Sequence, residues 1–302
     1  MSAGSQRARP WLAYALVTVV LWGAWGALAG LSAERGFPDT LVYCVWALTM
    51  IPPALFVLGR AGWALDRSPR AIGFGMAIGL LGAGGQMILF KALTTGPAYF
   101  IFPIISLSPV VTIALSMLLL RERTGRLGAA GIVLALVALP MLDLSFGDGD
   151  AQGLGWFPLA LLIMAAWGVQ AYFMKLANDS VSAESIFFYM MAGALLLVPV
   201  AWTMTDLSQP VNLGLDGPWM TAAIQILNAV GALTLVYAFR YGKAIVVAPL
   251  TNAGAPLVTA VLSLLFAGVV PGPLKMVGLA LALVASLLLV MEPERAPAAP
   301  RP

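Results

Sequence analysis

The sequence predicts an all-α integral membrane protein whose ten transmembrane helices form a 5+5 inverted-topology repeat. The first observation behind this prediction is composition: 61% of the 302 residues are hydrophobic and only 10% are charged, whereas a soluble domain carries about 25% charged residues. The second is that apolar stretches long enough to cross a bilayer as a helix recur along the whole chain. The third is that two distant segments read alike, which indicates an internal duplication.

Short connections divide the chain into ten predicted spans. The first is too long for a cleaved signal peptide, and it carries Trp22 and Gly23 where such a peptide would have a small-residue cleavage site. The Pro/Ala/Arg-rich segments 1–10 and 292–302 are predicted to be disordered cytoplasmic tails. In chain order the predicted spans are 11–31, 40–59, 71–94, 97–120, 126–143, 154–177, 183–203, 218–239, 244–268 and 273–291.

The duplication is clearest between residues 90–112 and 236–258. At a constant offset of 146 residues, Ala92 corresponds to Ala238 and Ser106 to Asn252. The first repeat is therefore predicted over 11–143 and the second over 154–291. Because each repeat holds five spans, an odd number, the second enters the membrane from the opposite side and the topology is inverted. The other predicted correspondences are Gly96 with Gly242, Ala98 with Ala244, Pro103 with Pro249, Trp25-Gly26 with Trp167-Gly168, Leu127 with Leu274, and Gly131 with Gly278.

The distribution of Lys and Arg predicts the orientation. With the N-terminus inside, all of the 16 basic residues except Arg35, Lys91 and Lys275 fall on the cytoplasmic side. A Lys/Arg excess in cytoplasmic connections sets topology, whereas acidic residues contribute little to it. We therefore expect a multi-pass protein of the cell inner (plasma) membrane with both termini in the cytoplasm. The net charge then reflects membrane topology and does not indicate a nucleic-acid partner.

Small residues and prolines indicate how the spans pack and bend. The first and third spans are rich in Gly and Ala, which let helix backbones approach closely in lipid. Pro103 and its counterpart Pro249 lie inside the fourth and ninth spans, each followed by a second proline, Pro109 or Pro256. An interior proline removes one backbone hydrogen bond and favours a kink. Pro103 and Pro249 are therefore predicted hinges, or alternatively residues that only shape a cavity wall.

The segment ALTTGPAYFIFPIISLSPVVTIALSMLLLRER at 92–123, its weaker copy near 238–266 and the two-half layout resemble the EamA-type members of the drug/metabolite transporter superfamily. The matching positions are Ala92-Leu93 and Ala98, the interior Pro103, and Glu122 after the leucine run. The second half departs from the pattern, because FAGVV at 266–270 has no acidic residue. The resemblance implies an exporter of amino acids or other metabolites, with relatives that carry sugars, nucleotide sugars or drugs. It also implies a central cavity lined mainly by spans 1, 3, 4, 6, 8 and 9.

Polar and aromatic side chains on these six spans are the candidate binding residues. Polar groups within a span are costly and need a partner or a water-filled cavity, and aromatic rings can stack on a planar or cationic substrate. The alternatives are interhelical hydrogen bonds for the polar residues and interfacial belts for the aromatic ones. The predicted substrate-binding residues are Trp22, Trp25, Gln86, Lys91, Tyr99, Ser106, Trp167, Gln170, Asn228, Tyr237 and Asn252.

Lys91 has three interpretations, because it lies a few positions from the outer end of the third span. Its stem can snorkel to the membrane interface. Its ammonium can instead face the cavity and hold a substrate carboxylate or phosphate, or it can pair with Glu34 at the outer end of the first span.

Missing residue types narrow the chemistry. The chain has no histidine and one cysteine, Cys44, and no carboxylate lies near the middle of a span. Proton-coupled carriers usually have such an intramembrane group, so facilitated diffusion or exchange is favoured, although Glu34 or Glu184 at span ends could titrate. The shortage of cavity Lys and Arg argues against a highly phosphorylated substrate. No catalytic residue, metal or cofactor is predicted, because zinc proteases and most membrane acyltransferases need His or paired acids. A serine–lysine dyad is conceivable, but nothing in the sequence places a serine beside Lys91.

The function predicted from the sequence is secondary transport of a small neutral or zwitterionic metabolite by alternating access, through export or facilitated exchange. The alternatives are a sugar or polyol uptake carrier and a flippase of a lipid-linked sugar. The expected partners are the solute and the lipid bilayer, and the protein is a monomer or a homodimer. Substrate identity, transport direction and any coupling ion stay open.

Overall fold

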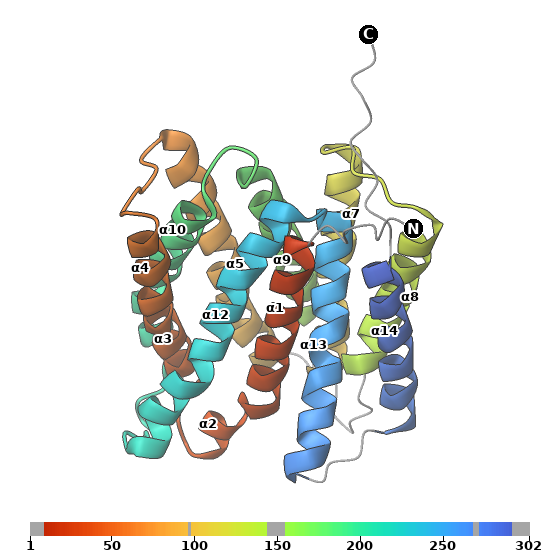
Figure 1. Cartoon of the computed structure of the whole chain (residues 1–302). Helices are drawn as coiled ribbons and strands as arrows, with labels where there is room; N and C mark the ends of the chain where they lie inside the picture. The colour runs from red at the N-terminus through yellow and green to blue at the C-terminus, as the bar shows by residue number, and fades with distance from the viewer. Residues whose placement is uncertain (1–8, 96–97, 144–154, 268–271, 292–302) are drawn as a thin grey trace.

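The computed structural model describes residues 9–95, 98–143, 155–267 and 272–291, so the predicted tails fall almost wholly outside it. The described residues form helices and no strand (Figure 1). The first half holds α1 (Pro10–Leu28), α2 (Leu31–Glu34), α3 (Asp39–Thr49), α4 (Ile51–Arg60), α5 (Pro69–Thr95), α6 (Ala98–Ile105), α7 (Ser108–Leu118) and α8 (Arg126–Asp143). The second half holds α9 (Trp156–Ala177), α10 (Ala183–Leu196), α11 (Val198–Thr203), the π-helix η1 (Leu215–Trp219), α12 (Met220–Tyr241), α13 (Ala244–Ala267) and α14 (Pro273–Met291).

The all-helical prediction is confirmed, and eight helical stretches in the described residues are long and apolar enough to cross a membrane. They correspond to eight of the predicted spans. The predicted spans 97–120 and 126–143 are represented by the shorter apolar helices Ser108–Leu118 and Arg126–Leu142. The fourth predicted span is interrupted because α6 ends at Ile105 and α7 begins at Ser108.

The two predicted hinge regions differ in structure. In the first half, the helix is interrupted between α6 and α7. Pro109 occupies the first turn of α7, where a missing backbone N–H costs little. In the second half, α13 continues as one helix through both Pro249 and Pro256. The backbone of Pro103 lies within α6, and its side chain is outside the described part. The hinge role of Pro103 and Pro249 remains a prediction.

Helix pairing follows the duplication. In the first half, α1 packs against α12 and α13 of the second half; in the second half, α9 packs against α5 and α7 of the first (Figure 1). The contact of α5 with α10 corresponds in the same way to the contact of α12 with α3. The last helices of the two halves, α8 and α14, pack against each other. Each half therefore completes its packing on the other, and the centre of the bundle is a seam between them.

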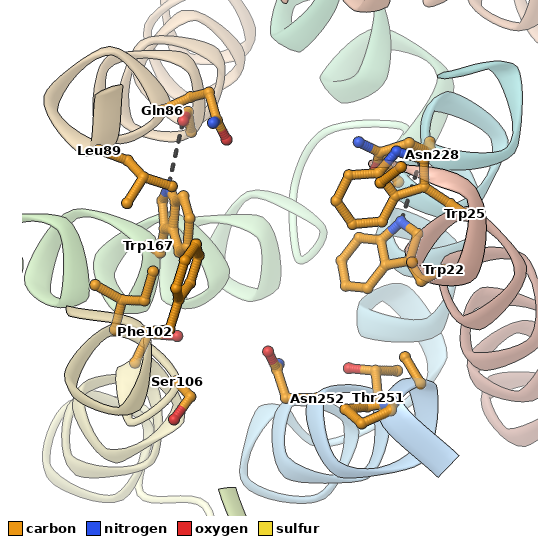
Figure 2. Close-up of a pocket in the computed structure, with 18 of the residues that line it drawn as sticks. Trp22, Trp25, Gln86, Leu89, Phe102, Ser106, Trp167, Asn228, Thr251 and Asn252 are labelled. Atoms are coloured by element: carbon orange, nitrogen blue, oxygen red, sulfur yellow. Dashed lines mark hydrogen bonds between the residues drawn. The ribbon is translucent and has the colours of Figure 1, made fainter. Parts of the chain in front are cut away.

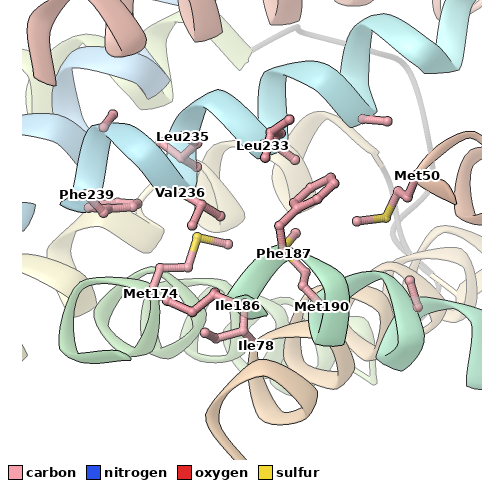
Figure 3. Close-up of a cluster of buried hydrophobic side chains, with 14 of the residues drawn as sticks. Met50, Ile78, Met174, Ile186, Phe187, Met190, Leu233, Leu235, Val236 and Phe239 are labelled. Carbon is pink, nitrogen blue, oxygen red and sulfur yellow. The ribbon is translucent and has the colours of Figure 1, made fainter. Parts of the chain in front are cut away.

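A cluster of buried side chains joins α5, α9, α10 and α12 on one side of this seam (Figure 3). Phe187 and Phe239 are fully buried in it, and the thioethers of Met174 and Met190 fill the space between the helices. This packing keeps α9 and α12 at fixed positions, and both helices carry predicted binding residues.

Candidate functional site

A cavity of about 1080 Å³ lies at the seam between the two halves. Its walls come mainly from α1, α3, α5, α9, α12 and α13, with parts of α6, α7, α8, α10 and α14 (Figure 2). The end of the bundle that holds the α4–α5, α7–α8, α9–α10 and α12–α13 connections, uppermost in Figure 1, is called the basic end below. At the opposite end the lining includes Gly30, Asp39, Gly272 and Lys275. No described lining residue belongs to the four basic-end connections, so the cavity extends toward one end of the bundle.

Trp22 and Trp167 line the cavity on opposite sides and are held in matching ways (Figure 2). The Trp22 Nε1–H donates to the carbonyl of Asn228 on α12 at 3.3 Å. The Trp167 Nε1–H donates to the carbonyl of Gly82 on α5 at 3.2 Å. Each indole also lies so close to a glycine of the helix it bonds that a Cβ there would overlap the ring; these glycines are Gly231 for Trp22 and Gly85 for Trp167.

The helices beside these tryptophans repeat a second contact. Thr259 of α13 donates its hydroxyl to the carbonyl of Gly23 at 2.9 Å, and Thr112 of α7 donates to the carbonyl of Gly168 at 3.0 Å. Trp22-Gly23 is therefore the structural counterpart of Trp167-Gly168. The sequence comparison, which aligned Trp25-Gly26 with Trp167-Gly168, was wrong by about one helical turn, because both dipeptides carry the same letters on the same helix. The repeated threonines, 147 residues apart, were a signal that could have found this register.

Trp25 also lines the cavity, but it has a different partner. Its Nε1–H donates to the side-chain oxygen of Gln225 at 3.1 Å. Gln225 is buried and lies one helical turn before Asn228, so it shares the cavity face of α12. Gln225 is not among the binding residues predicted from the sequence, although its spacing of three residues from Asn228 is a signal that could have found it.

Three predicted amide side chains line the cavity without a hydrogen-bond partner of their own in the described part of the protein. They belong to Gln86 on α5, Gln170 on α9 and Asn228 on α12. Ser106 and Asn252 also line it, on opposite sides of the lower part of Figure 2. The Asn252 amide donates to the carbonyl of Ala248 at 2.9 Å. Eight of the eleven predicted binding residues are thus brought to one cavity.

The structure does not bring the other three predicted residues to the cavity lining. Lys91 has an exposed side chain on α5 and is not among the lining residues. Tyr237 lies toward the basic end, where its hydroxyl donates to Glu184 Oε1 at 2.6 Å. The Tyr99 side chain lies outside the described part, and a role in binding remains a prediction for all three.

Aromatic rings pack the basic end between the two halves. Tyr14 of α1 stacks on Tyr237 with ring centroids 5.0 Å apart, and on Tyr241 at 5.9 Å. Both partners belong to α12, so this stack joins the first half to the second. The stack is not part of the cavity lining and lies at the basic end of the bundle.

Glu122 makes a second contact between the halves at the basic end. It lies in the connection between α7 and α8, and its two carboxylate oxygens accept the backbone N–H groups of Ala244 and Ile245, each at 3.1 Å. These N–H groups begin α13, where they have no partner within the helix and where the helix dipole favours an anion. Burial raises the pKa of the Glu122 carboxyl above its usual range, although the two N–H bonds and the nearby Lys175 and Lys243 ammonium groups act in the opposite direction.

The described residues contain no group of three His, Cys, Asp or Glu side chains that could hold a metal ion. The cavity instead offers indole rings, amides and hydroxyls, which bind organic solutes through stacking and hydrogen bonds.

A bundle of apolar helices of membrane-spanning length, with a large cavity between two related halves, defines a multi-pass membrane protein that transports small solutes. The chain belongs to the EamA-like transporter family, within the drug/metabolite transporter superfamily, because the family model matches residues 9–142 and again 154–291. This confirms the resemblance seen in the sequence.

The proteins similar to the chain include two relatives and one solved structure. Protein RarD of Streptomyces exfoliatus is 24% identical over 258 residues, which cover 82% of this chain and 75% of RarD. An uncharacterized protein of Methanocaldococcus jannaschii is 36% identical over 61 residues, which cover 20% of this chain and 44% of that protein. A protein known by its crystal structure matches with a TM-score of 0.74 at 18% identity, over 92% of this chain and 98% of the other. This last match shows that the fold is shared.

Proposed function

We propose that the chain is a ten-helix secondary transporter, built as a 5+5 inverted repeat, that moves a small neutral or zwitterionic metabolite by alternating access. The observation that carries the proposal is the cavity at the seam, which has repeat-related tryptophans on opposite sides and extends toward one end of the bundle. In this scheme α6–α7 together form the fourth helix and α8 the fifth. Equivalent rearrangements of two related halves would close one end and open the other.

The Lys/Arg distribution supports an orientation in the inner membrane with the basic end in the cytoplasm. The described conformation is then the outward-open state. Its cytoplasmic side is closed by the tyrosine stack around Tyr14 and by the contact of Glu122 with α13. Release of both contacts would be required for the inward-open state.

Counterflow in proteoliposomes tests the proposed function. A panel of amino acids, sugars and nucleosides is offered, and we expect saturable exchange of at least one member. Ser106→Trp should abolish this exchange because the added ring would occupy the cavity, whereas Phe56→Trp, at a side chain that is 67% exposed, should not. Absence of exchange for every solute, or movement of lipid-linked sugar alone, would refute the proposal.

The pH dependence of closure can be derived from Glu122. Because its pKa is raised while the basic end is closed, that conformation binds the proton more tightly than one in which Glu122 faces water. Acidification should therefore favour closure, and this advantage should be lost as the pH rises through the raised pKa. A cysteine placed at the buried Ala244, in a Cys44→Ala background, should react with a thiol reagent more slowly at acidic pH than the ionisation of its thiol alone explains. The same cysteine in a Glu122→Gln protein should follow only the ionisation of the thiol, and equal profiles in both proteins would contradict the derivation.

A further inference from the structure

We propose that the solute is a planar, uncharged heterocycle of the nucleobase type, taken either as the free base or as the nucleoside. The inference rests on the proposed transport function and narrows it. It follows from what the cavity walls can and cannot offer a ligand: fixed aromatic surface, no central charge and unpaired amides.

The tryptophans offer ring surface and no free N–H group. The Trp22 and Trp167 indole N–H groups are bound to backbone carbonyls of the neighbouring helix, and the Trp25 N–H is bound to Gln225. Gly231 and Gly85 allow Trp22 and Trp167 to lie directly against those helices, so the rings are held in place before a ligand arrives. Such an aromatic surface is favourable for every base, because each base has a flat π-face that can stack on it.

The space between the tryptophans is free of formal charge. Among the described lining residues only Asp39 and Lys275 are charged, and both lie in the first turn of their helices at the opposite end of the bundle. A carboxylate or ammonium group between the rings would therefore lose water without gaining a counter-charge, which is costly. This disfavours an amino-acid zwitterion, even one with an aromatic side chain.

The unpaired amides match the edge of a heterocycle. Gln86 lies beside Trp167, and Asn228 lies beside Trp22 and Trp25 on the other side of the cavity (Figure 2). Gln170 also lines the wall, with its amide packed against Gly82. Each amide carries two N–H donors and an acceptor oxygen, the combination that pairs with adjacent donor and acceptor groups on a base. A sugar could use these amides but would leave the ring surfaces without a flat partner.

The test is counterflow of radiolabelled adenine in proteoliposomes, with competitors that each change one property. Adenosine keeps the planar, uncharged ring; L-tryptophan has a planar ring but is zwitterionic; D-glucose is uncharged but not planar. We expect competition by adenine, uracil and adenosine and at least tenfold weaker competition by the other two. Stronger competition by adenosine than by adenine and uracil would assign the nucleoside. Stronger competition by adenine and uracil than by adenosine would assign the free base.

Cavity variants then connect recognition to the named residues. Trp22→Leu and Trp167→Leu should each weaken adenine competition about tenfold, Phe at either position should restore most of it, and Gln170→Leu should weaken it without changing the ring surfaces. Trp202→Leu, at an indole that is 55% exposed, is the matched control and should have no effect. Exchange of amino acids or sugars without any exchange of bases would overturn this inference and leave the transport function intact. A protein that exchanges no solute would overturn the transport function itself.

Discussion

Gly79→Ala should strongly destabilise the protein although it adds only one methyl group. Gly79 lies where α5 crosses α10, and a Cβ there would be 2.5 Å from the carbonyl oxygen of Met190 and 3.0 Å from the Cα of Gly193. Both are backbone atoms, so no side chain can rotate away and the two helices must separate. Overpacking of this kind costs about 1–3 kcal/mol, and it should lower the midpoint of thermal unfolding in detergent.

Gly84→Ala provides a control within the same helix. A Cβ at Gly84 would meet no atom within 4 Å, so the identical chemical change has space. Alanine also favours helix over glycine by up to about 1 kcal/mol, and the midpoint should stay the same or rise. Equal midpoints for Gly79→Ala and Gly84→Ala would show that α5 and α10 do not pack as closely as described.

Glu122→Ala should open the basic end. The substitution leaves the N–H groups of Ala244 and Ile245, two buried residues, without their acceptor, and a buried donor left unsatisfied costs about 1–3 kcal/mol. Because 1.4 kcal/mol is a factor of about ten in an equilibrium, a cysteine at Ala244 should react with a thiol reagent at least tenfold faster. Under the proposed orientation, a membrane-impermeant reagent should produce this increase from the cytoplasmic side.

Glu34→Ala is the matched control for the loss of one carboxylate. The Glu34 side chain is exposed at the opposite end of the bundle and has no partner among the described residues. Its removal should leave the labelling of the Ala244 cysteine unchanged. Glu122→Gln, which keeps one acceptor oxygen, should give an intermediate rate. If Glu122→Ala labels no faster than the parent, the carboxylate does not hold the two halves together.

The contact of Glu122 also gives a physical account of an asymmetry in the sequence. The equivalent segment of the second half, FAGVV at 266–270, has no acidic residue that could bind the start of α6 in the same way. In the sequence, a carboxylate is therefore present at this repeat position in the first half and absent from it in the second half.

The sequence predicts the residues of the candidate site where a polar or large aromatic residue stands within an apolar span. Trp22, Gln86, Trp167, Gln170 and Asn228 stood out because polar and large aromatic groups are costly or unusual there. Lys91 and Tyr237 stood out for the same reason and yet lie outside the cavity lining. Which face of a helix meets a cavity depends on its rotation against its neighbours, and in a span with apolar residues on all sides the hydrophobic pattern does not record that rotation.

The sequence by itself determined the membrane class, the helices, the duplication and the family, because apolar length, composition and repeated residues are properties of the chain in one dimension. Only the tertiary structure decided that Trp22, and not Trp25, is the counterpart of Trp167, and that Glu122 binds the start of α13. These facts join segments roughly a hundred or more residues apart. The physical reason is that helix register and closing contacts are set by the few places, such as Gly79, Gly85 and Gly231, where two backbones or an indole and a backbone can approach.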